Sequence, residues 1–166
     1  MKAPVKLEST HQLEQFDCGE PDLNRWLQRQ AFKSERDGGA RTYVVCDESE
    51  GHRVVAYYCL ASGSIVRSDA PGSISRNMPD PIPVMVMGRL AVDLQYQNHK
   101  LGSALLKDAL LRVLQVSEMV GIRAVLVHAI SETAKAFYLK YGFQESPHHP
   151  MTLMLSLSRV KKILVS

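Results

Sequence analysis

The sequence has few cysteines, no long apolar run and little net charge, and each absence excludes a class of protein. Its three cysteines, Cys18, Cys46 and Cys59, form an odd set without C-x-x-C spacing. We therefore expect buried, inert thiols, with neither a disulfide framework nor a metal site. No apolar stretch approaches the roughly 18 residues of a membrane helix. The opening MKAPVKLES lacks the apolar core of a secretion signal, which predicts a protein of the reducing cytoplasm.

The composition is that of a globular protein, and no change along the sequence marks a domain boundary. Hydrophobic residues make up 45% and charged residues 22% of the chain, so it can form a core. A net charge of +3 does not by itself indicate a nucleic-acid partner. No repeat, linker or low-complexity tract interrupts the 166 residues, which predicts a single domain spanning 1–166.

Hydrophobic periodicity predicts alternating strands and helices. β-branched and aromatic runs indicate strands, and apolar residues at helical spacing indicate helices. The predicted strands are 5–9, 41–46, 53–62, 84–92, 122–129 and 151–157, and the predicted helices are 21–36, 100–120 and 131–141. Residues 67–83, which hold four of the eight prolines, are expected to form a loop or a broken helix. The alternation in the second half predicts a layered α/β domain with parallel strand pairing.

Basic residues gather on one face of the first predicted helix. Arg25, Arg29, Lys33 and Arg36 fall within about 80° of one another when each residue advances by about 100°. Arg41, just beyond the helix, extends the row. Such a row is either an ordinary solvated face or a stripe that follows phosphates. The sequence alone leaves both interpretations open.

A strand, a polar turn and a helix follow one another in residues 88–110. The strand ends at Asp93 and the helix begins near Lys100. Backbone N–H groups at a helix start lack helical partners and can bind an anion. Gly102 would let a ligand approach the first turn. A lysine at this position opposes the helix dipole, which is easier to understand if a polyphosphate binds there.

The segment 127–143 also runs from a strand into a helix. The helix carries the pair Phe137 and Tyr138, and Gly142 and Phe143 follow it. The pair either packs in the core or presents the Tyr138 phenol to a ligand. A phenol has an ordinary pKa of about 10, so it is protonated at neutral pH and can donate to a departing thiolate.

Together these motifs resemble the acetyl-CoA core of the GNAT superfamily. The resemblance rests on 90–93, 97–102, 136–138 and 142–143. It implies an α/β (α+β) GNAT fold, a mixed central sheet of about six to seven strands flanked by about four helices. It also implies an N-acetyltransferase that uses acetyl-CoA and no metal, with Tyr138 as the catalytic acid. The implied coenzyme-binding residues are Leu90, Ala91, Val92, Gln97, Asn98, His99, Lys100, Leu101, Gly102, Ser103 and Phe137.

A narrower resemblance covers nearly the whole chain. The segments 16–19, 23–27, 39–42, 79–84 and 88–93 are similar to those of the GNAT toxins of bacterial toxin–antitoxin pairs, the TacT kind. This resemblance implies acetylation of the α-amine of aminoacyl-tRNA, which stops translation. It further implies an antitoxin of the ribbon–helix–helix type and commonly a homodimer. The basic row and Arg89 are then candidate contacts to tRNA.

One position departs from the superfamily pattern. Lys100 stands where the turn normally has its middle glycine. A residue with a Cβ does not adopt a positive φ cheaply. We therefore expect either a helical φ at Lys100 or a shifted loop, and this leaves the affinity for coenzyme open.

Three observations bear on the acceptor. Strand residues 84–88 carry no carboxylate or histidine, which suits an α-amine of pKa about 7.7–8.0 better than a lysine amine. His128 follows an apolar run and is expected to be a satisfied core histidine rather than a base. His148 and His149 lie in a predicted loop with no expected metal, and His99 is expected to face solvent.

Two other functions stay open. The chain can be an N-acetyltransferase for a small-molecule or protein amine, although no carboxylates cluster near the motifs to bind a cationic acceptor. It can also be a coenzyme-binding or repressor-assembly module without catalysis, in which Lys100 marks the lost activity.

Overall fold

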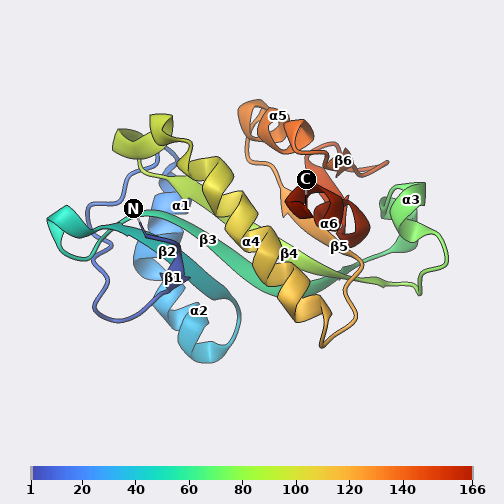
Figure 1. Ribbon diagram of the computed structural model, residues 1–166, viewed down its shortest axis with the longest axis horizontal. Helices are drawn as coiled ribbons and strands as arrows, with labels where there is room; N and C mark the ends of the chain where they lie inside the picture. Colours follow the sequence, from blue (N-terminus) through green and yellow to red (C-terminus); the bar gives the residue numbers. More distant parts are fainter. Residues whose placement is uncertain (1, 166) are drawn as a thin grey trace. The chain divides into compact units, whose positions relative to one another are not determined.

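The computed structural model describes residues 2–165, apart from the side chains of Asn98, His99 and Val165. Within this range one sheet holds seven strands in the order β1-β2-β3-β4-β5-β7-β6 (Figure 1). The strands are β1 Val5–Lys6, β2 Arg41–Asp47, β3 Arg53–Ile65, β4 Ile82–Val92, β5 Ala124–His128, β6 Gln144–Glu145 and β7 Thr152–Ser156. The α-helices are α1 Pro21–Arg29, α2 Ala31–Asp37, α3 Gly72–Ser75, α4 Leu101–Ser117, α5 Glu132–Lys140 and α6 Leu157–Val165. None of these helices is long and apolar enough to cross a membrane.

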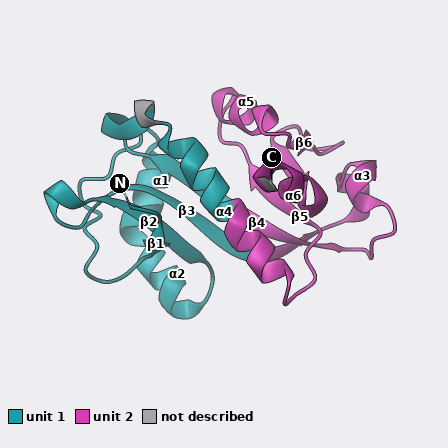
Figure 2. Cartoon of the chain, viewed as in Figure 1, with its two compact units in different colours: residues 1–61, 88–109 teal, residues 62–87, 110–166 magenta. Residues whose placement is uncertain are grey.

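The chain divides into two compact units (Figure 2). The first unit comprises residues 1–61 and 88–109, and the second comprises 62–87 and 110–166. Strands β3 and β4 and helix α4 each contribute residues to both units. The single domain expected over 1–166 stays a prediction.

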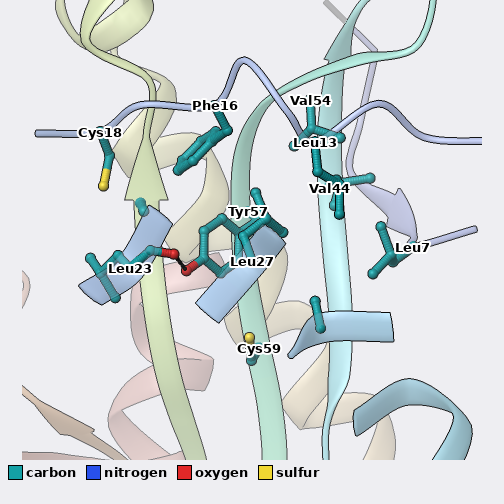
Figure 3. Close-up of a cluster of buried hydrophobic side chains, with 12 residues drawn as sticks. Leu7, Leu13, Phe16, Cys18, Leu23, Leu27, Val44, Val54, Tyr57 and Cys59 are labelled. Carbon is teal, nitrogen blue, oxygen red and sulfur yellow. Dashed lines mark hydrogen bonds between the residues drawn. The ribbon is translucent and has the colours of Figure 1, made fainter. Parts of the chain in front are cut away.

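The first unit is built on the predicted hairpin. Strands β2 and β3 pair antiparallel, with Tyr43 opposite Tyr58, and β1 adds to the edge of β2. Leu23 and Leu27 of α1 bury one face of that helix against Tyr57 and its neighbours (Figure 3). The Tyr57 hydroxyl donates a 2.7 Å hydrogen bond to the carbonyl of Leu23, so the buried phenol is satisfied.

The single helix predicted for 21–36 is wrong, because it is two helices. Gln30 has φ −118° and ψ −24°, which interrupts the helical path between α1 and α2. Ala31 is fully buried at the start of α2, and Gly38 ends this helix with a φ of 79°. Periodicity alone does not register a bend of this kind, since the apolar spacing continues across it.

The second unit contains the parallel pairing that the alternation predicted. Val84–Val86 of β4 pair parallel with Ala124–Leu126 of β5. Strand β7 then pairs antiparallel with β5, and β6 pairs with β7. On one face Ile82, Leu126 and Met154 form an apolar core with the buried Ile74 of α3.

The predicted start and end of α5 are confirmed. The Ser131 hydroxyl accepts a 3.1 Å hydrogen bond from the backbone N–H of Ala134, as a helix N-cap does. Gly142 follows the helix with a φ of 93°, a conformation that favours glycine.

The loop or broken helix expected over 67–83 is consistent with the short helix α3, whereas β6 and the last helix were not predicted. Helix α6 begins at Leu157, where the last strand was expected to end. Its residues Leu157 and Val160 are buried, which stabilises its packing by about 1.5–3 kcal/mol for each fully buried side chain.

Candidate functional site

The turn after β4 is anchored by a buried carboxylate. Asp93 is only 2% exposed. Its two oxygens accept hydrogen bonds from the backbone N–H groups of Gln95, at 3.0 Å, and Asp17, at 3.1 Å. The guanidinium of Arg53 lies 3.6 Å from the same carboxylate. A buried charge is tolerated when it is paired and hydrogen-bonded in this way.

Arg53 connects the turn to the hairpin between β2 and β3. It is 9% exposed and donates to Glu50 at 2.8 Å and to the side chain of Gln95 at 3.2 Å. Its guanidinium also lies 5.8 Å from the centre of the Tyr96 ring, and the Tyr96 hydroxyl donates to Asp47. The first half of the turn is therefore held by side chains some 40 positions away in the sequence.

The side-chain amide of Gln97 is hydrogen-bonded to backbone carbonyls of the protein itself. Its amide donates to the carbonyls of Val92, at 3.0 Å, and Cys18, at 3.2 Å. Of the preceding strand residues, Ala91 and Val92 are buried and Leu90 is half-buried. A ligand role for Gln97 thus belongs to its backbone rather than to its amide. The side chains of Asn98 and His99 lie outside the described part of the chain, and so does the exposure expected for His99.

Lys100 adopts a backbone conformation outside the helical region that one sequence expectation assumed. Its φ of 57° and ψ of 20° place it in the left-handed region, so the expected helical φ is wrong, and the expected shift of the loop stays a prediction. This conformation costs roughly 1–2 kcal/mol for a residue with a Cβ. The exposed side chain of Lys100 leaves the turn toward solvent.

Helix α4 begins directly after Lys100 and runs for 17 residues. The predicted helix bounds of 100–120 are therefore close, with an end at Ser117 rather than Val120. The first-turn residues Leu101, Gly102 and Ser103 are half-buried. Backbone N–H groups in a first turn have no acceptor within the helix and carry the positive end of its dipole. The geometry therefore suits the diphosphate of a coenzyme, and this anion site stays a prediction.

In the second unit, Tyr138 is a neutral phenol in an aromatic setting. Its ring lies 5.3 Å from the rings of both Phe137 and Phe143, and the residue is 7% exposed. Burial raises the pKa of Tyr138 above its ordinary value. The hydroxyl therefore keeps its proton through neutral and moderately alkaline pH.

The Tyr138 hydroxyl is nevertheless reachable. It makes no hydrogen bond with another described group. Yet the one side-chain nitrogen or oxygen in the described chain that is both buried and unpaired is Nε of Arg53. The phenolic oxygen therefore retains access to solvent or a ligand while its ring is packed. The packing of the aromatic pair is thus confirmed, and the presentation of the Tyr138 phenol to a ligand stays a prediction.

A cavity of about 320 Å³ lies in the second unit at the last β4–β5 pair, Val86 and Leu126. Its remaining walls come from Gly63, Ser64, Ile65, Asp69, His128, His149 and Thr152. In open α/β sheets, ligands bind beyond the carboxyl ends of parallel strands, which is where this cavity opens. The cavity was not predicted from the sequence, although the placement of Leu126 and His128 on one strand face was a usable signal.

The expectation for His128 is wrong, because this residue is exposed rather than in the core. Its Nδ1 lies 3.0 Å from the hydroxyl of Thr152, which orients the ring. His149 lies 3.4 Å from the Asp69 carboxylate. Among residues 2–165 no group of three or more histidine, cysteine or acidic side chains can hold a metal ion.

The basic row is divided by the break between α1 and α2. Arg25 pairs with Asp22 at 3.0 Å, Arg36 with Asp37 at 3.6 Å and Arg41 with Glu35 at 3.9 Å. Two exposed cations, Arg29 and Lys33, make no ion pair with other described residues. Exposed pairs of this kind are weak, and phosphate binding by this row stays a prediction.

Arg89 is packed against an aromatic stack. Its guanidinium lies 4.2 Å from the centre of the Trp26 ring, and Trp26 stacks on Tyr57 with an interplanar angle of 8°. Arg89 thus packs on this π system. The stack is worth about 0.5–2 kcal/mol and fixes Arg89 on the α1 side of the first unit.

Two of the three cysteines are buried, as expected, and all three are free thiols. Burial raises the pKa of Cys59 to about 12, and it also raises the pKa of Cys18. Cys46 is half-buried, with its pKa likewise raised by burial. The three groups are therefore protonated, unreactive thiols at neutral pH.

The chain belongs to the GNAT acetyltransferase family. Residues 38–145 match the family model described as "Acetyltransferase (GNAT) domain". The protein is therefore an N-acetyltransferase that takes its acetyl group from acetyl-CoA, and the GNAT fold implied by the sequence motifs is confirmed.

Comparison with individual proteins shows which acetyltransferases the chain is similar to. The chain is 42% identical over 162 residues to a tRNA-acetylating toxin of Mycobacterium tuberculosis, covering 98% of this chain and 96% of that protein. It matches the structure of AtaT complexed with acetyl-methionyl-tRNAfMet at a TM-score of 0.90 and 28% identity, covering 97% and 98% of the two chains. A tyrosine-to-phenylalanine AtaT toxin, bound to acetyl-CoA and to the C-terminus of the antitoxin AtaR, matches at 0.84 and 25%, covering 99% and 98%.

Proposed function

We propose that this protein is an acetyl-CoA-dependent toxin that acetylates the α-amine of aminoacyl-tRNA, blocks translation and is neutralised by a cognate antitoxin. The observation that carries the substrate is the 42% identity to a tRNA-acetylating toxin along 98% of the chain. A shared fold alone would not specify an acceptor. Similarity at this level over the full length, together with cations on α1 and α2, supports a tRNA substrate.

The donor is bound by backbone more than by side chains. The diphosphate rests on the backbone N–H groups of residues 97–103, at the start of α4, with the side chain of Lys100 beside it. The backbone of Leu90, Ala91 and Val92 aligns the pantetheine arm, and Phe137 contacts it. The buried Asp93–Arg53 pair keeps the turn in shape, which supports this assignment.

Tyr138 is the general acid. Acetyl-CoA supplies an acetyl group activated as a thioester. The neutral α-amine of the acceptor attacks the carbonyl carbon, a C–N bond forms and the C–S bond breaks. Tyr138 Oη gives its proton to the departing sulfur, and the proton lost by the amine goes to solvent. A raised pKa keeps that proton in place before transfer, and an α-amine of pKa about 7.7–8.0 needs no strong base.

The cavity at Val86 and Leu126 receives the aminoacyl group. Its apolar floor suits a small or medium apolar side chain, and the His128 imidazole, oriented by Thr152, can hydrogen-bond the ester or amine. The tRNA backbone is contacted by the basic residues of the first unit, namely Arg25, Arg29, Lys33, Arg36, Arg41 and Arg89. Such phosphate contacts make affinity fall steeply with salt.

The assembly we propose has four parts. The single domain acts in the cytoplasm, forms a homodimer, binds aminoacyl-tRNA and is held inactive by an antitoxin of the ribbon–helix–helix type. The support for an antitoxin is the structural likeness to AtaT, whose complex with the C-terminus of AtaR is known.

A competition between acceptors tests the proposal. Labelled acetyl-CoA is offered with aminoacyl-tRNA, polyamines and peptides under the same conditions. We expect label on aminoacyl-tRNA and background on the rest, because the one carboxylate lining the cavity, Asp69, is paired with His149. Transfer chiefly to polyamines or peptides would make the protein a small-molecule or protein acetyltransferase. Transfer to none, with antitoxin binding kept, would make it a non-catalytic assembly module.

A further inference from the structure

A second hollow, of about 370 Å³, lies within the second unit between the end of α5 and helix α6. Three cations and one aromatic ring line it, and no acidic residue of the described part of the chain does. Its walls are Lys140, Tyr141, Gly142, Arg159, Lys162 and Ile163. None of these residues belongs to the acetyl-transfer machinery assigned above. We call this hollow the α6 pocket.

Helix α6 presents its cations on the side away from the core. Leu157 and Val160 are buried against the sheet. Arg159, Lys162 and Ile163 stand at i, i+3 and i+4 and so share the opposite face. Lys161 is exposed and does not line the pocket, since it lies about 100° around the helix from Lys162.

The other wall of the pocket is fixed to α6 by a hydrogen bond. Arg159 donates to the carbonyl of Gly142 at 3.2 Å. Gly142 has a φ of 93°, and a Cβ on it would come within 3.7 Å of the Arg159 guanidinium. A glycine here lets the chain turn and bring Tyr141 and Lys140 next to α6. The pocket is thus a formed feature of this unit.

Among the described residues, the cations of the α6 pocket have no carboxylate partner. Within residues 2–165, Lys140, Arg159 and Lys162 form no ion pair, whereas nearby Lys135 pairs with Glu145 at 2.8 Å. All three are exposed. Like charges that line one hollow repel each other, and an anionic ligand relieves that repulsion.

The pocket also offers an aromatic surface. Tyr141 is half-buried, its ring centre lies 5.2 Å from that of Phe137, and the Lys140 ammonium lies 5.9 Å from the ring. Aromatic faces beside cations are the usual platform for unpaired bases and phosphates of RNA. An acidic peptide would use the cations but would not stack on the ring.

From this combination we infer that the α6 pocket is a second RNA-binding site, which holds a phosphate and an unpaired base of the tRNA substrate. The inference rests on the proposed function, because that function supplies the RNA. It places RNA contacts in the second unit, in addition to those proposed on α1 and α2.

A pair of charge reversals on adjacent residues tests this site. Lys162→Glu reverses a charge inside the pocket, and Lys161→Glu makes the same change in net charge outside it. Binding of tRNA is measured by fluorescence anisotropy over a range of salt concentrations. We expect Lys162→Glu to weaken binding about tenfold and to reduce the salt slope by about 1. Lys161→Glu should weaken it no more than about threefold.

Two further readouts separate the possible outcomes. Thermal unfolding and acetyl-CoA binding should be unchanged in both variants, because both lysines are exposed. Equal tRNA affinities and salt slopes for the two variants would overturn the inference, and so would a loss of antitoxin binding alone, which would assign the pocket to a protein partner. If the unmodified protein binds tRNA without acetylating aminoacyl-tRNA, the proposed function fails. The comparison of Lys162→Glu with Lys161→Glu then still tests whether the α6 pocket binds RNA. If the unmodified protein binds no tRNA, both fail.

Discussion

Replacing Lys100 separates a backbone effect from a charge effect at the start of α4. The left-handed conformation of Lys100 costs roughly 1–2 kcal/mol for a residue with a Cβ. Glycine removes this strain but loses about 0.5–1 kcal/mol more backbone freedom on folding. The free energy of unfolding of the Lys100→Gly variant should therefore be about 0.5–1 kcal/mol higher than that of the unmodified protein. For a protein of this size that difference raises Tm by about 1–4 °C.

Lys100→Ala is the matched control. Alanine also removes the ammonium, but it keeps the Cβ and hence the strain, so its Tm should not rise. Both variants should bind acetyl-CoA up to about fivefold more weakly at low salt, since an exposed charge pair contributes about 0.2–1 kcal/mol. Differential scanning calorimetry and calorimetric titration with acetyl-CoA measure the two effects. A glycine variant no more stable than the alanine variant would refute the backbone argument. Unchanged affinity in both would remove the ammonium from coenzyme binding.

Three other predictions follow from contacts in the structure. Asp93→Asn removes the charge of a carboxylate that is 2% exposed and lies next to Arg53. It should therefore lower the free energy of unfolding, measured in urea, by about 1–3 kcal/mol and raise KM for acetyl-CoA. An unchanged KM would contradict the role of the turn. Gly63→Ala would place a Cβ 2.7 Å from Val86, so it should cost about 1–3 kcal/mol and raise KM for aminoacyl-tRNA but not for acetyl-CoA, whereas equal effects on both would argue against the cavity. Because burial raises the pKa of Tyr138, its proton stays bound as pH rises through the ordinary value of about 10. The value of kcat/KM should therefore rise while the α-amine deprotonates near pH 7.7–8.0 and stay level to about pH 9.5. A decline at lower pH would count against Tyr138 as the acid.

Local features of the fold were predictable from sequence. Ser131 caps α5 and Gly142 ends it because capping depends on residues within one turn of each other. The hairpin and the parallel β4–β5 pair follow from alternation and element order. The motif singled out Tyr138 as a candidate, and the structure adds that the residue is buried, which raises its pKa.

Long-range contacts were beyond such reasoning. Arg53 and Asp93 are 40 positions apart in the sequence, and no periodicity predicts their ion pair. The same holds for the guanidinium of Arg89 on Trp26. His128 was expected in the core because its strand is apolar, but the last residue of a strand is often free to face outward.

Lys100 shows a different limit. A rule that a residue with a Cβ avoids positive φ is statistical, and a strained residue persists where its surroundings fix the turn. Here the buried Asp93 carboxylate and the Gln97 amide hold the chain on the side before Lys100. The sequence states the residue but not the constraint that overrides its preference.

The central claim is that the Tyr138 phenol protonates the departing thiolate during transfer to aminoacyl-tRNA. Tyr138→Phe keeps the ring and its contacts with Phe137 and Phe143 while it removes the hydroxyl. Single-turnover acetylation of aminoacyl-tRNA should fall by about 100- to 10,000-fold, with the Kd for acetyl-CoA unchanged. A variant that acetylates aminoacyl-tRNA at the unmodified rate would contradict the account.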